Sequence, residues 1–334
     1  MREGGEGDRF EELTLAGDEL SPKEAAKLED AVSRDPGDLE NRARLLGYYS
    51  HHMFDSEDAR AAYERHAFWV VENEPESPLA GTVAMTGLCA LGNETAEKAT
   101  QLWRKQVDAS PGSISVLGNA ANLLPHTDEQ LGLEYLRKGQ ELEPDHPRWH
   151  ERLGPHLFLS GIREVPATER RKRAGMALEE YEKAARLTED PEGRQLILEY
   201  QAKTAYESGN LEKAEWYARK LLASARHLTA PLRGNAIHHG NMILGRLALQ
   251  QGDVEKAKER LMAAGSKHAT LQREAFGPNL ALAKELLESG ERETVLRFLK
   301  LWEGAWAKQT GDLAKWTQEI EDGEIPDFEA NLYY

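Results

Sequence analysis

The chain has 334 residues, of which 40% are hydrophobic and 30% are charged, so it is long and apolar enough to form a substantial core. Its 58 acidic residues outnumber its 42 basic residues, and the formal net charge is -16. A field of this sign repels the phosphates of nucleic acids and of anionic lipids, so we expect neither as a partner. The single cysteine, Cys89, excludes an intramolecular disulfide, and its apolar surroundings are typical of a buried, inert thiol.

Residues 1–20 are acidic and glycine-rich, and they predict a flexible leader with too little apolar surface to become ordered. They lack the apolar core of a secretory signal, and no run of about 18 apolar residues occurs in the chain. We therefore expect no membrane span. The cytoplasm is the default location, and a signal peptide removed before this sequence begins is left open.

Helical periodicity starts at residue 21, where Ser21 and Pro22 have the residue types of an N-cap and a first helical position. Apolar residues then recur every three or four positions almost to the end, without an alternating strand pattern. Prolines follow polar helix ends at intervals that fit a repeat of about 34 residues with insertions. They are Pro36, Pro75, Pro111, Pro144 and Pro191. Because proline cannot continue a helix but tolerates the first turn of the next, this punctuation predicts an all-α fold of repeated hairpins.

The clearest repeat lies in residues 244–261. It contains, in order, Leu244, Gly245, Ala248, Gly252, Asp253, Ala257 and Leu261. This spacing closely resembles the tetratricopeptide repeat (TPR) family, in which small residues let two antiparallel helices pack closely. Weaker units with the same period extend the resemblance over about residues 22–305. Ala99 and Trp103 mark the second helix of the second unit, and Tyr181 lies on the second helix of the fourth. The resemblance implies a right-handed α-α superhelix of about seven helical hairpins spanning residues 21–305, each hairpin burying its apolar stripe against the next.

Residues 306–334 predict a capping helix, around 313–320, and an aromatic tail. The tail has two interpretations. It packs on the last hairpin as a lid, or it occupies a groove on this molecule or on a neighbouring one.

In the family that the chain resembles, the first helix of each repeat lines the concave surface. The resemblance therefore implies a set of peptide-binding side chains on these helices. They are Asn119, Asn122, Arg148, Arg152, Tyr200, Lys203, His239 and Arg246. The same positions also include Phe158 and Met242.

Two of these residues, Arg148 and Arg152, are four positions apart and share one helical face. Their guanidinium groups could bind a carboxylate of an acidic or C-terminal peptide segment. The alternative is that both arginines pair with acidic residues on neighbouring helices. The basic run 170–173 has a similar interpretation as a solvated face that meets acidic neighbours or another subunit.

These features predict a non-catalytic scaffold that binds a peptide segment or a protein surface in its concave groove. No catalytic residue and no cofactor is expected, and self-association into a homo-oligomer is left open. The alternative is a metal-dependent enzyme that gathers histidines on the concave face. Neither His51-His52 nor His238-His239 forms a compact ligand pair, because adjacent helical residues point about 100° apart.

Overall fold

A computed structural model describes residues 6–124, 127–160, 165–265, 277–302 and 312–333. The chain divides into two compact units, unit 1 (Met1–Trp149) and unit 2 (His150–Tyr334). The predicted all-α fold is confirmed, since the described residues form helices and turns and contain no strand. The boundary between the two units lies inside the range 21–305, which the sequence predicts to be one hairpin array.

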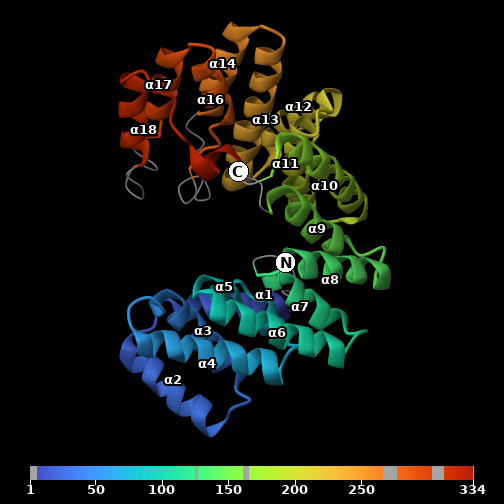
Figure 1. Ribbon diagram of the computed structural model, residues 1–334, viewed down its shortest axis with the longest axis vertical. Helices are drawn as coiled ribbons and strands as arrows, with labels where there is room; N and C mark the ends of the chain where they lie inside the picture. Colours follow the sequence, from blue (N-terminus) through green and yellow to red (C-terminus); the bar gives the residue numbers. More distant parts are fainter. Residues whose placement is uncertain (1–5, 125–126, 161–164, 266–276, 303–311, 334) are drawn as a thin grey trace. The chain divides into compact units, whose positions relative to one another are not determined.

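Unit 1 consists of helices joined by short turns (Figure 1). Its α-helices are α1 (Glu6–Gly17), α2 (Pro22–Arg34), α3 (Leu39–His52), α4 (Glu57–Asn73), α5 (Gly87–Ala90), α6 (Asn93–Ala109), α7 (Ile114–Leu123) and α8 (Glu129–Leu142). Two 3-10 helices, η1 (Pro78–Gly81) and η2 (Val83–Thr86), precede α5. The predicted N-cap at Ser21 is confirmed, because Ser21 caps α2 and forms a capping box with Glu24, but α1 precedes it.

Helix α1 differs from the flexible leader that the sequence predicts for residues 1–20. It is ordered because two glycines let its backbone approach α3 closely. A Cβ atom at Gly47 would lie 1.8 Å from the carbonyl oxygen of Thr14, and one at Gly17 would lie 2.2 Å from that of Arg44. This helix gains its order from backbone packing rather than from a strong apolar stripe, which is why its composition alone predicts disorder.

The second predicted hairpin has only its second helix. Ala99 and Trp103 are fully buried on α6, as the repeat pattern predicts. In place of a first helix, the chain forms η1, η2 and the single turn of α5, and the hydroxyl of Tyr63 donates to the carbonyl oxygen of Ala84 (2.5 Å). The residues after Pro78 therefore form short 3-10 turns that tertiary contacts hold in place, instead of one continuous helix.

Unit 2 continues the hairpin pattern from α9 (Pro147–Leu159), which starts in unit 1. Its other α-helices are α10 (Ala167–Leu187), α11 (Pro191–Glu207), α12 (Leu211–Ser224), α13 (Ala230–Gln250), α14 (Val254–Ala264), α16 (Ala281–Glu288), α17 (Arg292–Lys300) and α18 (Asp312–Glu321). Short 3-10 helices are η4 (Ala225–His227) and η5 (Glu329–Leu332). Each helix from α10 to α14 packs on the next one, and the first helices α11, α13 and α16 also pack side by side. This is the local packing of stacked hairpins.

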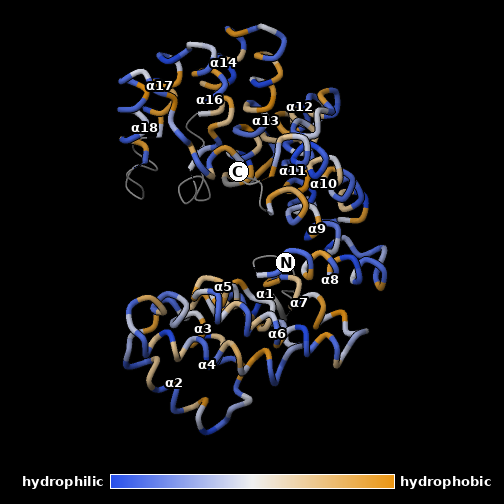
Figure 2. Tube along the Cα trace, in the orientation of Figure 1, coloured by the Kyte–Doolittle hydropathy of each residue, from blue (hydrophilic) through white to orange (hydrophobic). Residues whose placement is uncertain are grey.

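Glycine turns join the helices within three of these hairpins. Gly209, Gly252 and Gly290 follow the first helices and have φ angles of 81, 80 and 89°. Such left-handed backbone strongly favours glycine, so this turn geometry explains Gly252 in the repeat of residues 244–261. Hydrophobic and hydrophilic stretches alternate along most helices (Figure 2). The apolar faces of α13 to α18 meet in one buried cluster, which also contains Phe328 of the tail.

Candidate functional site

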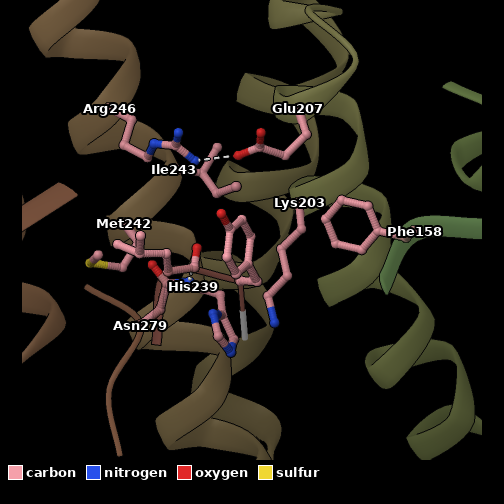
Figure 3. Close-up of a pocket in the computed structure, with 10 residues that line it drawn as sticks. Phe158, Lys203, Glu207, His239, Met242, Ile243, Arg246 and Asn279 are labelled. Carbon is pink, nitrogen blue, oxygen red and sulfur yellow. Dashed lines mark hydrogen bonds and ion pairs between the residues drawn. The ribbon is translucent and has the colours of Figure 1, made fainter. Parts of the chain in front are cut away.

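Unit 2 contains a narrow groove between its helices and the C-terminal tail. It collects side chains from α9, α11 and α13, from the segment before α16, and from the end of the tail. The lining residues are Phe158, Lys203, Glu207, His239, Met242, Ile243, Arg246, Asn279, Leu332 and Tyr333. In Figure 3, Arg246 and Glu207 lie at one end of the groove, and His239 and the amine of Lys203 lie at the other.

Helical spacing explains why these residues converge. On α11, Glu199, Lys203 and Glu207 are each four residues apart, so they share one face. On α13, His239 and Arg246 are seven residues apart and also share one face. Asp190 caps α11 through its side chain, which accepts a hydrogen bond from the backbone N–H of Gly193. Because α11 packs on α13, the two polar faces line one groove.

Arg246 closes one end of the groove with charge pairs. Its Nη1 is 2.6 Å from a carboxylate oxygen of Glu207, and its Nη2 is 2.7 Å from one of Glu285. Its guanidinium carbon also lies 4.0 Å from the ring centre of Tyr206. Burial alone would lower the pKa of Arg246, but the two carboxylates raise it overall. This arginine is therefore committed to its own chain and fixes the relative positions of α11, α13 and α16.

The other end contains a buried carboxyl group and an amine. Glu199 is 5% exposed, and its Oε1 has no hydrogen-bond partner in the described part of the chain. Burial raises the pKa of Glu199 to about 7, an effect partly offset by Lys203. Burial likewise lowers the pKa of Lys203 to about 8, partly offset by Glu199. His239 Nε2 is 3.9 Å from Glu199 Oε2. This end of the groove carries groups that change charge near neutral pH.

Lys203 is the cation of this groove that has no close carboxylate. Its amine lies 5.3 Å from the ring centre of Tyr200, which stacks on Tyr181. Among the residues that the structure describes, no carboxylate oxygen is within 4.0 Å of the Lys203 amine. A ligand carboxylate could therefore pair with Lys203 without first breaking an existing ion pair.

The segment before α16 holds the tail at the groove. The side-chain amide of Asn279 donates to the carbonyl oxygen of Leu332 (3.3 Å). The backbone N–H of Asn279 donates to Nε2 of His238 (3.0 Å), which leaves Nδ1 of His238 to donate to the carbonyl oxygen of Ala264 (3.1 Å). His238 is thus a structural group that positions Asn279 beside the tail.

The predicted site residues of unit 1 bind a segment of their own chain. The Nδ2 of Asn119 donates to the carbonyl oxygens of Pro75 and Ser77, both at 2.9 Å. The Nδ2 of Asn122 donates to the carbonyl oxygen of Gly81 (2.7 Å). The two amides hold a polypeptide backbone, which is the chemistry that the resemblance implies, but here the backbone is residues 75–81.

The two arginines that the sequence predicts to bind a carboxylate, Arg148 and Arg152, both lie on α9. Arg148 pairs with Glu143, and its guanidinium lies 4.7 Å from the ring centre of Trp149. Burial alone would raise the pKa of Glu143, but hydrogen bonds from Arg148 and Trp149 lower it overall. Arg148 thus pairs with a neighbouring acidic residue, as the alternative interpretation of the sequence expects. Arg152 is partly buried on α9.

The binding residues predicted from the sequence lack five groove residues, namely Glu207, Ile243, Asn279, Leu332 and Tyr333. Glu207 follows Lys203 by one helical turn, so helical spacing alone could have indicated it, and Ile243 directly follows the predicted Met242. The other three depend on a chain reversal that joins segments about fifty residues apart, which no local pattern shows. The basic run also contacts the tail, since Nη1 of Arg170 donates to the hydroxyl of Tyr333 (3.4 Å).

Other features bear on the remaining expectations. Within the described ranges, no group of three or more His, Cys, Asp or Glu residues could hold a metal ion. None of the described helices is both long and apolar enough to cross a bilayer. Cys89 is only partly buried, rather than buried as expected. Burial still raises the pKa of its thiol to about 11, which agrees with an inert cysteine.

No protein-family model matches the chain, and no curated protein matches it.

Proposed function

We propose that this protein is a TPR-like interaction scaffold whose unit 2 holds a segment of a partner protein in the groove between α9, α11 and α13. One observation carries the proposal: the groove already holds a polypeptide backbone group, the carbonyl oxygen of Leu332, which accepts a hydrogen bond from the side-chain amide of Asn279. A site with this donor, apolar walls and a cation suits an extended peptide better than a small polar substrate.

The partner segment has to satisfy the polar groups of the groove. We infer that it presents a backbone carbonyl to Asn279, an apolar side chain to Met242 and Ile243, and a carboxylate to Lys203. This carboxylate can belong to an acidic side chain or to a C-terminus, so the expected partner remains an acidic or C-terminal segment. The net charge of -16 disfavours nucleic acid as the partner.

The metal-dependent enzyme that the sequence left as an alternative gains no support from the described residues. His238 binds two backbone groups, and His51 and His52 pair with Asp18 and Asp55.

A peptide selection tests the proposal. Peptides displayed on phage would be selected against the full chain, and their affinities would be measured for Lys203→Met and for the matched Lys220→Met. Lys220 is an exposed lysine on α12, outside the groove, whose amine lies over the ring of Trp216. Selected peptides should bind Lys203→Met about tenfold more weakly, the loss of one charge-assisted contact, and should bind Lys220→Met as they bind the parent. Equal binding to both variants would show that the selected peptides do not bind in this groove.

A further inference from the structure

The tail consists of an anchor and a tip. The anchor, residues 326–331, is fixed in the core: Phe328 is fully buried and lies edge-on to Trp316, with ring centres 5.2 Å apart. The side-chain amide of Asn331 donates to the carbonyl oxygen of Pro278 (2.9 Å), and the carbonyl oxygen of Asn331 accepts from the N–H of Leu280 (2.8 Å). The anchor therefore acts as the lid that the sequence left as one interpretation.

The tip, Leu332 and Tyr333, is held less firmly. Both residues are only partly buried. The hydrogen bonds that the tip accepts from the side chains of Asn279 and Arg170 measure 3.3 and 3.4 Å, whereas typical protein hydrogen bonds of this kind lie near 2.9 Å. Leu332 also packs against the edge of the buried cluster, and the backbone N–H of Tyr333 donates to the carbonyl oxygen of Ala330 (3.0 Å). Release of the tip breaks these contacts and leaves those of the anchor in place.

The tip also fills the space that a partner needs. With Leu332 and Tyr333 as walls, the groove retains a cavity of about 30 Å³, enough for roughly one or two water molecules. A second polypeptide segment does not fit beside them. Binding in this groove and docking of the tip therefore exclude each other.

We propose that the tip is an intramolecular competitor of the partner segment, and that the groove selects partner segments with the chemistry of the tip. Such a segment has a carbonyl at the Leu332 position, a branched apolar side chain, and then an aromatic ring whose hydroxyl meets Arg170. This inference rests on the proposed function and adds to it the sequence class of the ligand. It also predicts that the groove is free of the tip for only a small fraction of the time. The apparent affinity for a partner segment is then the intrinsic affinity multiplied by that fraction.

The test measures the shielding of Lys203, which shares the groove with the tip. The full chain and a variant that ends at Asn331 would be treated with an amine-acetylating reagent, and the rate at each lysine would be followed by mass spectrometry. The shorter variant keeps Phe328 and Asn331, so the core remains anchored. Lys203 should react about tenfold faster in it, because a shielded amine reacts only during opening, whereas the exposed Lys220 should react equally in both. The double variant Leu332→Ser/Tyr333→Ser, which keeps the chain length, should behave like the shortened chain.

The ligand class is tested on the shortened variant with a tripeptide. Acetyl-Leu-Tyr-Tyr at millimolar concentration, the effective concentration of a short tethered segment, should slow acetylation of Lys203 again, and acetyl-Ser-Ser-Ser should not. Equal protection by the two tripeptides, or protection by neither, overturns the ligand class. Equal Lys203 rates in the full and shortened chains overturn the competitor. A Lys203 rate in the full chain that changes with protein concentration assigns the tip to a second copy and overturns the intramolecular arrangement.

The two proposals fail separately. If peptide selection succeeds on both chains while Lys203 reacts equally in both, the groove binds partners and the tip does not compete. If selection succeeds on neither chain while shortening exposes Lys203, the tip occupies the groove and the partner-binding function is wrong.

Discussion

Replacing Asn119 with alanine distinguishes a structural amide from a ligand-binding one. In the structure its Nδ2 donates to the carbonyl oxygens of Pro75 and Ser77, each at 2.9 Å. Asn119→Ala removes both bonds and leaves two partly buried carbonyl groups without this donor. At about 1 kcal/mol for each neutral hydrogen bond, the segment 75–82 should lose roughly 2 kcal/mol of local stability.

Hydrogen exchange measures this loss where it occurs. The amides of Ala80 and Thr82 donate to the carbonyl oxygens of Ser77 and Leu79, so they report the opening of this segment. A local loss of about 2 kcal/mol should accelerate their exchange roughly thirtyfold. The matched control is Asn73→Ala, since Asn73 is an exposed residue on α4 whose amide donates to the carbonyl oxygen of Trp69 one turn earlier. This control should leave exchange at Ala80 and Thr82 unchanged.

One result would refute the structural interpretation of Asn119. If Asn119→Ala leaves the exchange of Ala80 and Thr82 as it was but abolishes binding of the selected peptides, the amide serves a partner. The resemblance would then describe unit 1 as well as unit 2. If exchange accelerates and peptide binding is unchanged, the amide serves residues 75–81.

Three further predictions concern packing, the tail and pH. Gly47→Ala places a methyl group 1.8 Å from the carbonyl oxygen of Thr14, so it should displace α1, cost roughly 2 kcal/mol of stability and increase tryptic cleavage after Arg9. The control Gly175→Ala, whose added methyl group has its nearest neighbour at 3.9 Å, should be neutral or stabilise the protein by up to about 1 kcal/mol. Unchanged cleavage in Gly47→Ala would contradict the docking of α1. Glu329 has a φ of 48° in the turn that directs the tail, so Glu329→Val should cost about 1–2 kcal/mol and accelerate exchange of the Asn331 amide, and unaltered exchange would show that this turn does not hold the tail. Because burial raises the pKa of Glu199 from 4.5 to about 7, the folded chain binds that proton more tightly than the unfolded chain, and the resulting stabilisation is present below pH 4.5 and lost as the pH rises to about 7. Between pH 5 and pH 7 the parent should therefore lose roughly 2–3 kcal/mol more stability than Glu199→Gln in urea unfolding, and parallel pH profiles would show that the carboxyl is not held in its protonated form.

The parts of the fold that the sequence predicts are those stabilised locally. Ser21 and Ser56 cap helices with their own side chains, and the φ angle of 80° at Gly252 favours glycine at that turn. The fully buried Trp103 and Tyr181 follow from the repeat period, since they project from the apolar stripes of second helices. These features depend on residues within one or two helical turns, so a single sequence contains enough information to place them.

The parts that the sequence does not predict depend on distant segments. Helix α1 is ordered by the approach of Thr14 to Gly47, more than thirty residues later. The segment that replaces the first helix of the second hairpin depends on Asn119 in the same way. The resemblance implies Lys203 and Arg246 as groove residues, and both line the groove of unit 2, yet no local pattern shows that Glu207 and Glu285 already neutralise Arg246. Their peptide-binding role remains a prediction.

Amide side chains in both units hold polypeptide from the same chain, and the strength of these contacts separates structure from recognition. An amide donor recognises a carbonyl oxygen whichever chain supplies it, and a segment of the same chain has the advantage of a millimolar effective concentration. In unit 1, Asn119 and Asn122 make three such bonds of 2.7 to 2.9 Å to a segment that joins α4 to α6, so its release would require local unfolding. In unit 2, the hydrogen bond from Asn279 to the tip measures 3.3 Å and lies beside a lysine that has no carboxylate oxygen within 4.0 Å among the described residues. We therefore expect a partner segment to displace the occupant in unit 2 at lower free-energy cost than in unit 1, and this difference, rather than the number of predicted binding residues, is why we propose the binding groove in unit 2.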